Sequence, residues 1–115
     1  MHELNATQNI VKILVETCKE KNISKVDIVK LSVGVLTTYE KEPLIQYYNL
    51  LKKEFNSLSD SSLKINIVPG KILCATCMKE SLISSEIELL CNTCGGVNTT
   101  IIGGTQVIIT DLKIK

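Results

Sequence analysis

Four cysteines in two matched pairs are the residues of this chain best suited to metal chemistry. Thirteen residues separate the two C-x-x-C pairs, which consist of Cys74 with Cys77 and Cys91 with Cys94. Each C-x-x-C makes a tight turn that directs two thiolates at one position, and zinc prefers four soft ligands in a tetrahedron. The spacing therefore predicts a structural zinc site. A catalytic zinc is not expected, because four thiolates leave no open coordination position.

Other uses of these cysteines stay open as minor alternatives. Disulfides would need an exported protein, and the residues that open the chain do not resemble a signal peptide. A redox C-x-x-C pair does not need a second copy, and an iron centre is a further alternative. The fifth cysteine, Cys18, falls in a helical pattern and is predicted to be a small buried hydrophobic residue.

Composition argues against several classes of function. The net charge is +1, and all thirteen basic residues are lysine, whereas arginine dominates the reading of bases and phosphates. We therefore expect no nucleic-acid partner. No apolar run reaches the ~20 residues of a transmembrane helix, so no membrane partner is expected. Five cysteines without an export signal predict a cytoplasmic, reducing location.

The residues that could catalyse a reaction are few. No phosphate-binding loop of the G-x-x-x-x-G-K-[ST] type is present. Paired carboxylates fall in segments that we expect to be solvated, for which exposed surface charge is the ordinary explanation; these pairs are Glu40 with Glu42 and Glu86 with Glu88. We therefore predict that the protein is not an enzyme.

The elements that must position the cysteines follow from the apolar periodicity. Helical spacing marks residues 5–20 and 43–56, and alternation marks strands at 25–35, 63–67 and 107–114. In the first helix, the predicted core-facing residues are Ala6, Ile10, Ile13, Leu14 and Cys18. In the second helix, Pro43 suits the first helical position. This order predicts an α+β fold, with two helices on a three-stranded mixed sheet.

The cysteine segment interrupts this plan between the second and third predicted strands. We expect residues 71–100 to form a zinc-ribbon domain inserted into an α/β domain made of residues 1–70 and 101–115. The inserted segment shows few regular apolar periods. We therefore expect that it depends on its metal in order to fold.

The extreme N-terminus carries the only histidine, His2. Taken alone, such a residue is usually an ordinary exposed side chain. However, a free α-amine, the amides that follow it and an imidazole together form adjacent chelate rings. This donor set favours square-planar Ni(II) or Cu(II).

Met1-His2-Glu3 followed by a helix, together with the two cysteine pairs, resembles the hydrogenase nickel-incorporation protein family HypA. Further stretches are similar to strands of that family, so the resemblance covers essentially the whole chain: Val33-Gly34-Val35-Leu36, Leu63 to Ile67 and Gly104 to Ile114. It implies a nickel metallochaperone whose α/β domain binds nickel. His2 would be the side-chain ligand, and the Met1 amine with the amides of His2 and Glu3 would complete the set. The Glu3 carboxylate is a further candidate, and the four cysteines would bind zinc.

The same resemblance implies partners. The family passes nickel to a maturation GTPase of the HypB type and on to the large subunit of [NiFe]-hydrogenase, and in some bacteria it also serves urease. Members often have serine near position 5, where this chain has Asn5. The chain also lacks the histidines that many members carry beside their cysteines, and this second departure weakens the expectation of a urease or acid-response role. We expect a monomer or weak dimer. The alternative is a non-catalytic zinc-ribbon protein-interaction module, which gives His2 no role.

Overall fold

A computed structural model describes residues 2–85 and 87–115, and the chain divides into two compact units. The first, here called the α/β unit, comprises Met1–Leu31, Tyr39–Asn66 and Ile109–Lys115. The second, here called the ribbon unit, comprises Ser32–Thr38 and Ile67–Ile108.

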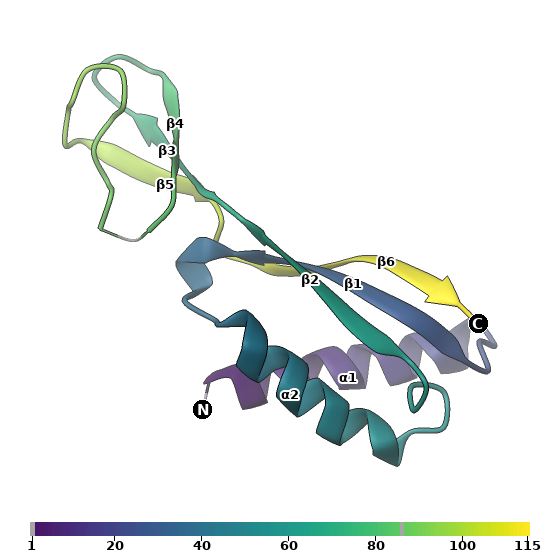
Figure 1. Ribbon diagram of the computed structural model, residues 1–115. Coiled ribbons are helices and arrows are strands. Elements are labelled where there is room, and N and C mark those ends of the chain that lie inside the picture. Colours follow the sequence, from purple (N-terminus) through teal and green to yellow (C-terminus); the bar gives the residue numbers. More distant parts are fainter. Residues whose placement is uncertain (1, 86) are drawn as a thin grey trace. The chain divides into compact units, whose positions relative to one another are not determined.

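The predicted order of helices and strands in the α/β part of the chain is confirmed (Figure 1). The elements are α1 (His2–Glu20), β1 (Val26–Gly34), α2 (Lys41–Leu51), β2 (Ser62–Val68) and β6 (Val107–Ile114). The sheet order is β2-β1-β6. Strands β1 and β2 run in the same direction with α2 as their crossover, β6 runs against them, and both helices lie on one face of this mixed sheet.

The core-facing stripe of α1 differs from the predicted one. The buried residues are Thr7, Ile10, Val11, Leu14 and Cys18. Ile13 is 51% exposed, so its predicted core position was wrong, whereas Cys18 is buried as predicted. Thr7 can lie in the buried stripe because its side-chain hydroxyl donates a hydrogen bond to the Glu3 carbonyl at 2.6 Å. The only polar group of the Thr7 side chain is therefore satisfied.

Helix α2 begins at Lys41, so Pro43 is its third residue and the predicted first position was wrong. The position still suits proline, because the first amides of a helix have no carbonyl to bind within it. Leu44 and Tyr48 are buried, and a 3₁₀ turn at Lys52–Glu54 follows the helix. The second helical segment therefore ends before Phe55.

The ribbon unit contains three short strands that the sequence analysis did not predict. They are β3 (Gly70–Cys74), β4 (Glu80–Ile83) and β5 (Thr99–Gly103), paired antiparallel in the order β4-β3-β5. A 3₁₀ turn at Val35–Thr37 also belongs to this unit. Its buried hydrophobic residues, among those described, are Val33, Ile72, Cys74, Ile83 and Cys91. Two of these five are cysteines, so the apolar core is small.

The division by contacts differs from the predicted domain boundaries. Residues 32–38, 67–70 and 101–108 lie with the cysteine segment. Independent folding of residues 71–100, and of residues 1–70 with 101–115, stays a prediction. Within the described residues, neither helix is long and apolar enough to cross a membrane.

Candidate metal-binding sites

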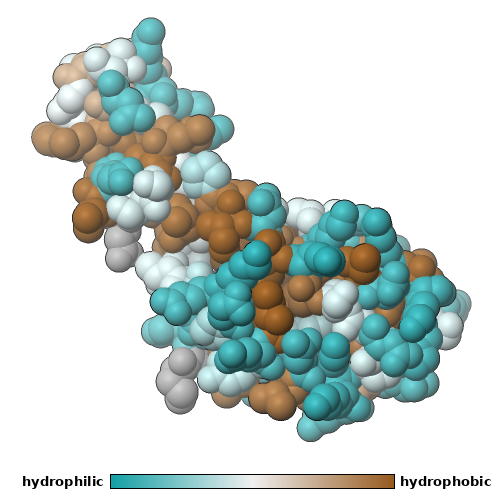
Figure 2. Space-filling view, viewed as in Figure 1, coloured by the Kyte–Doolittle hydropathy of each residue, from teal (hydrophilic) through white to brown (hydrophobic). Residues whose placement is uncertain are grey.

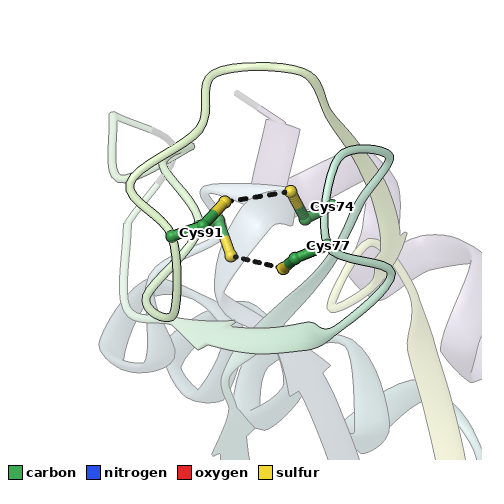
Figure 3. Close-up of side chains that lie close together, drawn as sticks. Cys74, Cys77 and Cys91 are labelled. Carbon is green, nitrogen blue, oxygen red and sulfur yellow. Dashed lines mark hydrogen bonds between the residues drawn. The ribbon is translucent and has the colours of Figure 1, made fainter.

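The four cysteines of the two C-x-x-C pairs converge on one point of the ribbon unit. Cys74 ends β3, Cys77 lies in the turn that leads to β4, and the other two precede β5. All four sulfurs lie within 4.8 Å of one another. The Sγ atoms of Cys77 and Cys91 are 3.5 Å apart, and those of Cys74 and Cys94 are 3.6 Å apart; Figure 3 shows both pairs as dashed lines.

The size of this cluster fits a tetrahedral zinc ion. With Zn–S bonds of ~2.3 Å, the sulfurs of a four-thiolate site lie roughly 3.8 Å apart. The observed separations are close to that value and far above the ~2.05 Å of a disulfide. All five cysteines of the chain are free thiols in the structure. The donor set can therefore hold a metal such as zinc with no open coordination position.

The two turns that carry the cysteines repeat one geometry. In each, the residue after the second cysteine donates its N–H to the carbonyl of the first, from Met78 to Cys74 and from Gly95 to Cys91, both at 2.9 Å. Met78 and Gly95 both adopt the left-handed conformation, with φ of 63° and 71°. The residue at this position therefore closes the turn, and glycine adopts its conformation with least strain.

Backbone amides favour the thiolate form at Cys91. The Thr93 N–H lies 3.4 Å from the Cys91 sulfur. Donation from the amides of Cys94 and Thr93 lowers the pKa of Cys91 to about 6. At Cys94 the Gly96 N–H also acts to lower the pKa, but the neighbouring thiols and desolvation outweigh it and raise the pKa to about 11. Thiolate character at Cys91 prepares the site for a cation.

The second candidate site is the start of α1. His2 is exposed and is the first residue of the helix, while Met1 lies outside the described residues. The first amides of an α-helix take no part in its i→i−4 ladder. The amides of His2 and Glu3 therefore lie outside the ladder of α1.

The Glu3 side chain has a partner that the sequence analysis missed. Its Oε2 accepts a hydrogen bond from the backbone N–H of Glu40 at 3.1 Å. This bond is the main reason that the pKa of the Glu3 carboxyl is lowered, and the amide of Glu3 itself acts in the same direction. The carboxylate that was a candidate nickel ligand thus contacts the residue before α2.

Comparison with known proteins gives one family. The model of a family described as "Hydrogenase/urease nickel incorporation, metallochaperone, hypA" matches residues 1–114. A hydrogenase maturation factor HypA from Aquifex aeolicus (strain VF5) is 32% identical over 115 residues, which cover 100% of this chain and 98% of that one. The factor of the same name from Moorella thermoacetica is 33% identical over 106 residues, which cover 92% of each chain.

Two solved structures share the fold. The solution structure of the Ni metallochaperone HypA from Helicobacter pylori aligns with a TM-score of 0.73 and 17% identity, and covers 97% of this chain and 96% of that chain. A second structure, described as the solution structure of HypA protein, aligns with a TM-score of 0.75 and 18% identity, and covers 100% of this chain and 97% of that chain. At such identities the likeness speaks for the fold alone.

Proposed function

Since this chain belongs to the HypA family of hydrogenase/urease nickel-incorporation metallochaperones, we propose that it binds Ni(II) at its N-terminus and delivers it to the large subunit of [NiFe]-hydrogenase. The match of the family model to residues 1–114, which include Met1-His2-Glu3, is the observation that carries this proposal. A maturation GTPase of the HypB type is the proposed partner in the transfer.

The proposed nickel ligands are the Met1 amine, the imidazole and amide of His2, and the amide of Glu3. Three features of the chain support this set. His2 is exposed, it is the first residue of α1, and the first amides of a helix are not part of its hydrogen-bond ladder. An amine, an imidazole and deprotonated amides favour square-planar Ni(II). Because the site is exposed, the ligands of a partner protein replace the nickel ligands of this chain one at a time, as delivery of the metal requires.

The proposed role of the four cysteines is to bind a structural zinc ion that folds the ribbon unit. The separation of their sulfurs and the small apolar core of this unit support the assignment.

The ribbon unit also exposes large apolar side chains, which is typical of protein-docking surfaces (Figure 2). These side chains include Met78, Leu82, Ile87, Leu90 and Val97. The proposal includes no catalytic step, and it places the protein in the cytoplasm as a monomer or weak dimer.

The decisive experiment is metal stoichiometry on untagged protein with its native N-terminus. Wild type and His2→Ala are loaded with nickel, desalted and analysed for both metals. We expect about one zinc per chain in both proteins and nickel in the wild type alone, because four thiolates hold zinc independently of the N-terminus. A short N-terminal extension should act like His2→Ala, because it removes the free amine next to the imidazole.

The contrary outcome favours a different function. Equal nickel in wild type and His2→Ala, or no nickel in either, would remove the N-terminal site. The zinc and the exposed apolar side chains of the ribbon unit would then support a non-catalytic protein-interaction module.

A further inference from the structure

We propose that Glu3 is a positioning residue: its carboxylate caps the N-terminus of α2 and so fixes the nickel-binding end of α1, and it does not serve as a nickel ligand. This inference rests on the proposed N-terminal nickel site. It assigns to one residue two separate tasks: the backbone amide is a proposed nickel ligand, and the side chain caps another helix.

The first observation is the unusual source of the cap on α2. Glu40 is the N-cap residue, with extended backbone at φ −96° and ψ 141°, and its own side chain makes no capping bond. In a capping box, the side chain of the third helical residue accepts from the N-cap amide. That residue is Pro43 here, which has no acceptor in its side chain. Glu3, 37 residues earlier, supplies the missing oxygen at 3.1 Å.

The second observation is that Glu3 is held at two points. Thr7 is fully buried, and its hydroxyl donates to the Glu3 carbonyl at 2.6 Å. The carboxylate is held by the Glu40 amide, where the positive end of the α2 dipole also favours a negative group. The residue that follows His2 is thus fixed at its backbone and at its side chain, while His2 is exposed. Such outer contacts orient metal ligands in other sites.

The two roles of the carboxylate give opposite expectations for the Glu40 amide. If the carboxylate caps α2 throughout, this N–H keeps its acceptor when nickel binds. If the carboxylate turns to nickel, it leaves α2 on metal binding, and the N–H becomes open to solvent exchange. The Glu40 amide therefore reports whether the carboxylate stays on α2, and the Glu3 variants below report whether nickel needs its negative charge.

The first test measures hydrogen exchange of the Glu40 amide in zinc-loaded, untagged wild type, with and without nickel. Acid stops the exchange and releases the metals before the amide is read by NMR. We expect the protection of Glu40 to be kept or increased by nickel. Loss of protection on nickel loading would overturn the proposal.

The second test compares nickel affinity in Glu3→Ala, Glu3→Gln and a control, Glu42→Ala. The control removes an exposed acidic residue from the first turn of α2, the helix that Glu3 caps. Nickel is titrated against a competing chelator. We expect Glu3→Ala to weaken nickel binding about tenfold, as loss of an orienting contact does, and to abolish Glu40 protection in the nickel-free protein. Glu3→Gln keeps an acceptor oxygen and should restore both properties, and Glu42→Ala should change neither.

Failure of this inference and failure of the proposed function are distinguishable. If the N-terminal site is wrong, nickel content does not depend on His2. If only the positioning role is wrong, nickel content depends on His2, but Glu3→Ala binds nickel as tightly as wild type, or Glu3→Gln is as weak as Glu3→Ala.

Discussion

At the scale of single residues, the two cysteine turns are alike in hydrogen bonding but differ in strain. Gly95 and Met78 occupy the same place after the second cysteine, and both have positive φ. Glycine reaches that conformation at little cost, whereas a side chain adds a penalty of ~1 kcal/mol. The first turn therefore carries strain that the second avoids.

Met78→Gly should stabilise the metal-loaded ribbon unit by up to about 1 kcal/mol, because it removes this strain. Little burial is lost, since the Met78 side chain is 68% exposed. Zinc transfer to a competing chelator measures the effect, and we expect tighter retention in the variant. The matched control is Gly95→Ala at the equivalent position, which should release zinc more readily. Easier zinc release from Met78→Gly would contradict the assignment of strain.

At the scale of helices and strands, periodicity predicted the elements that have a long, one-sided apolar pattern. Both helices and the strands β1, β2 and β6 were predicted on that basis. Strands β3, β4 and β5 were missed because each has only four or five residues. In β3 the inward positions are Gly70, Ile72 and Cys74, so a glycine and a metal-type ligand stand where apolar residues would mark a strand.

The candidate sites also divide into what local sequence predicts and what it does not. Convergence of the four thiols follows from local spacing, because each C-x-x-C turn directs its own pair. The contact between Glu3 and the Glu40 amide joins the starts of two helices that lie far apart in sequence. Only the packing of α1 on α2 brings them together. The single local hint is Pro43, which leaves the capping box of α2 without its usual acceptor.

A buried pair of hydroxyls, those of Tyr48 and Ser61, 2.5 Å apart, joins α2 to the residue that precedes β2. The Ser61 hydroxyl also donates to the Leu58 carbonyl at 2.6 Å. Tyr48→Phe should lower the free energy of unfolding of the α/β unit by about 1 kcal/mol, the net value of one such bond. Urea denaturation followed by helical circular dichroism measures this, since α1 and α2 both belong to that unit. Tyr47→Phe is the control, and an equal loss there would show that the Tyr48 hydroxyl contributes nothing specific.

At the scale of the whole molecule, the two units differ in what holds them together. The α/β unit buries large side chains completely, among them Leu14, Leu31, Leu44, Tyr48 and Leu58. The ribbon unit has few buried apolar residues, and two of those are candidate metal ligands. Hydrophobic burial thus accounts for the first unit, whereas we propose that the second also needs the free energy of metal binding.

Removal of zinc should therefore unfold one unit and spare the other. We expect a strong chelator, or Cys74→Ser, to abolish hydrogen-exchange protection in β3 and across roughly residues 71–100, because metal binding supplies most of the folding free energy of so small a core. The α/β unit should keep its protection. Tyrosine fluorescence offers an independent check, because Tyr39, Tyr47 and Tyr48 all belong to the α/β unit.

This account requires that metal removal abolishes the hydrogen-exchange protection of β3 and leaves the tyrosine fluorescence unchanged. If metal removal unfolds both units together, they form one cooperative structure, and the ribbon unit is stabilised by the α/β unit as well as by zinc. If β3 stays protected without metal, its small apolar core is sufficient and the cysteines are not its main support. An unchanged tyrosine signal with loss of β3 protection would mean that the fold of the α/β unit does not require zinc, and the proposed nickel site could then form without it. Nickel stoichiometry of the zinc-free protein then tests that independence directly.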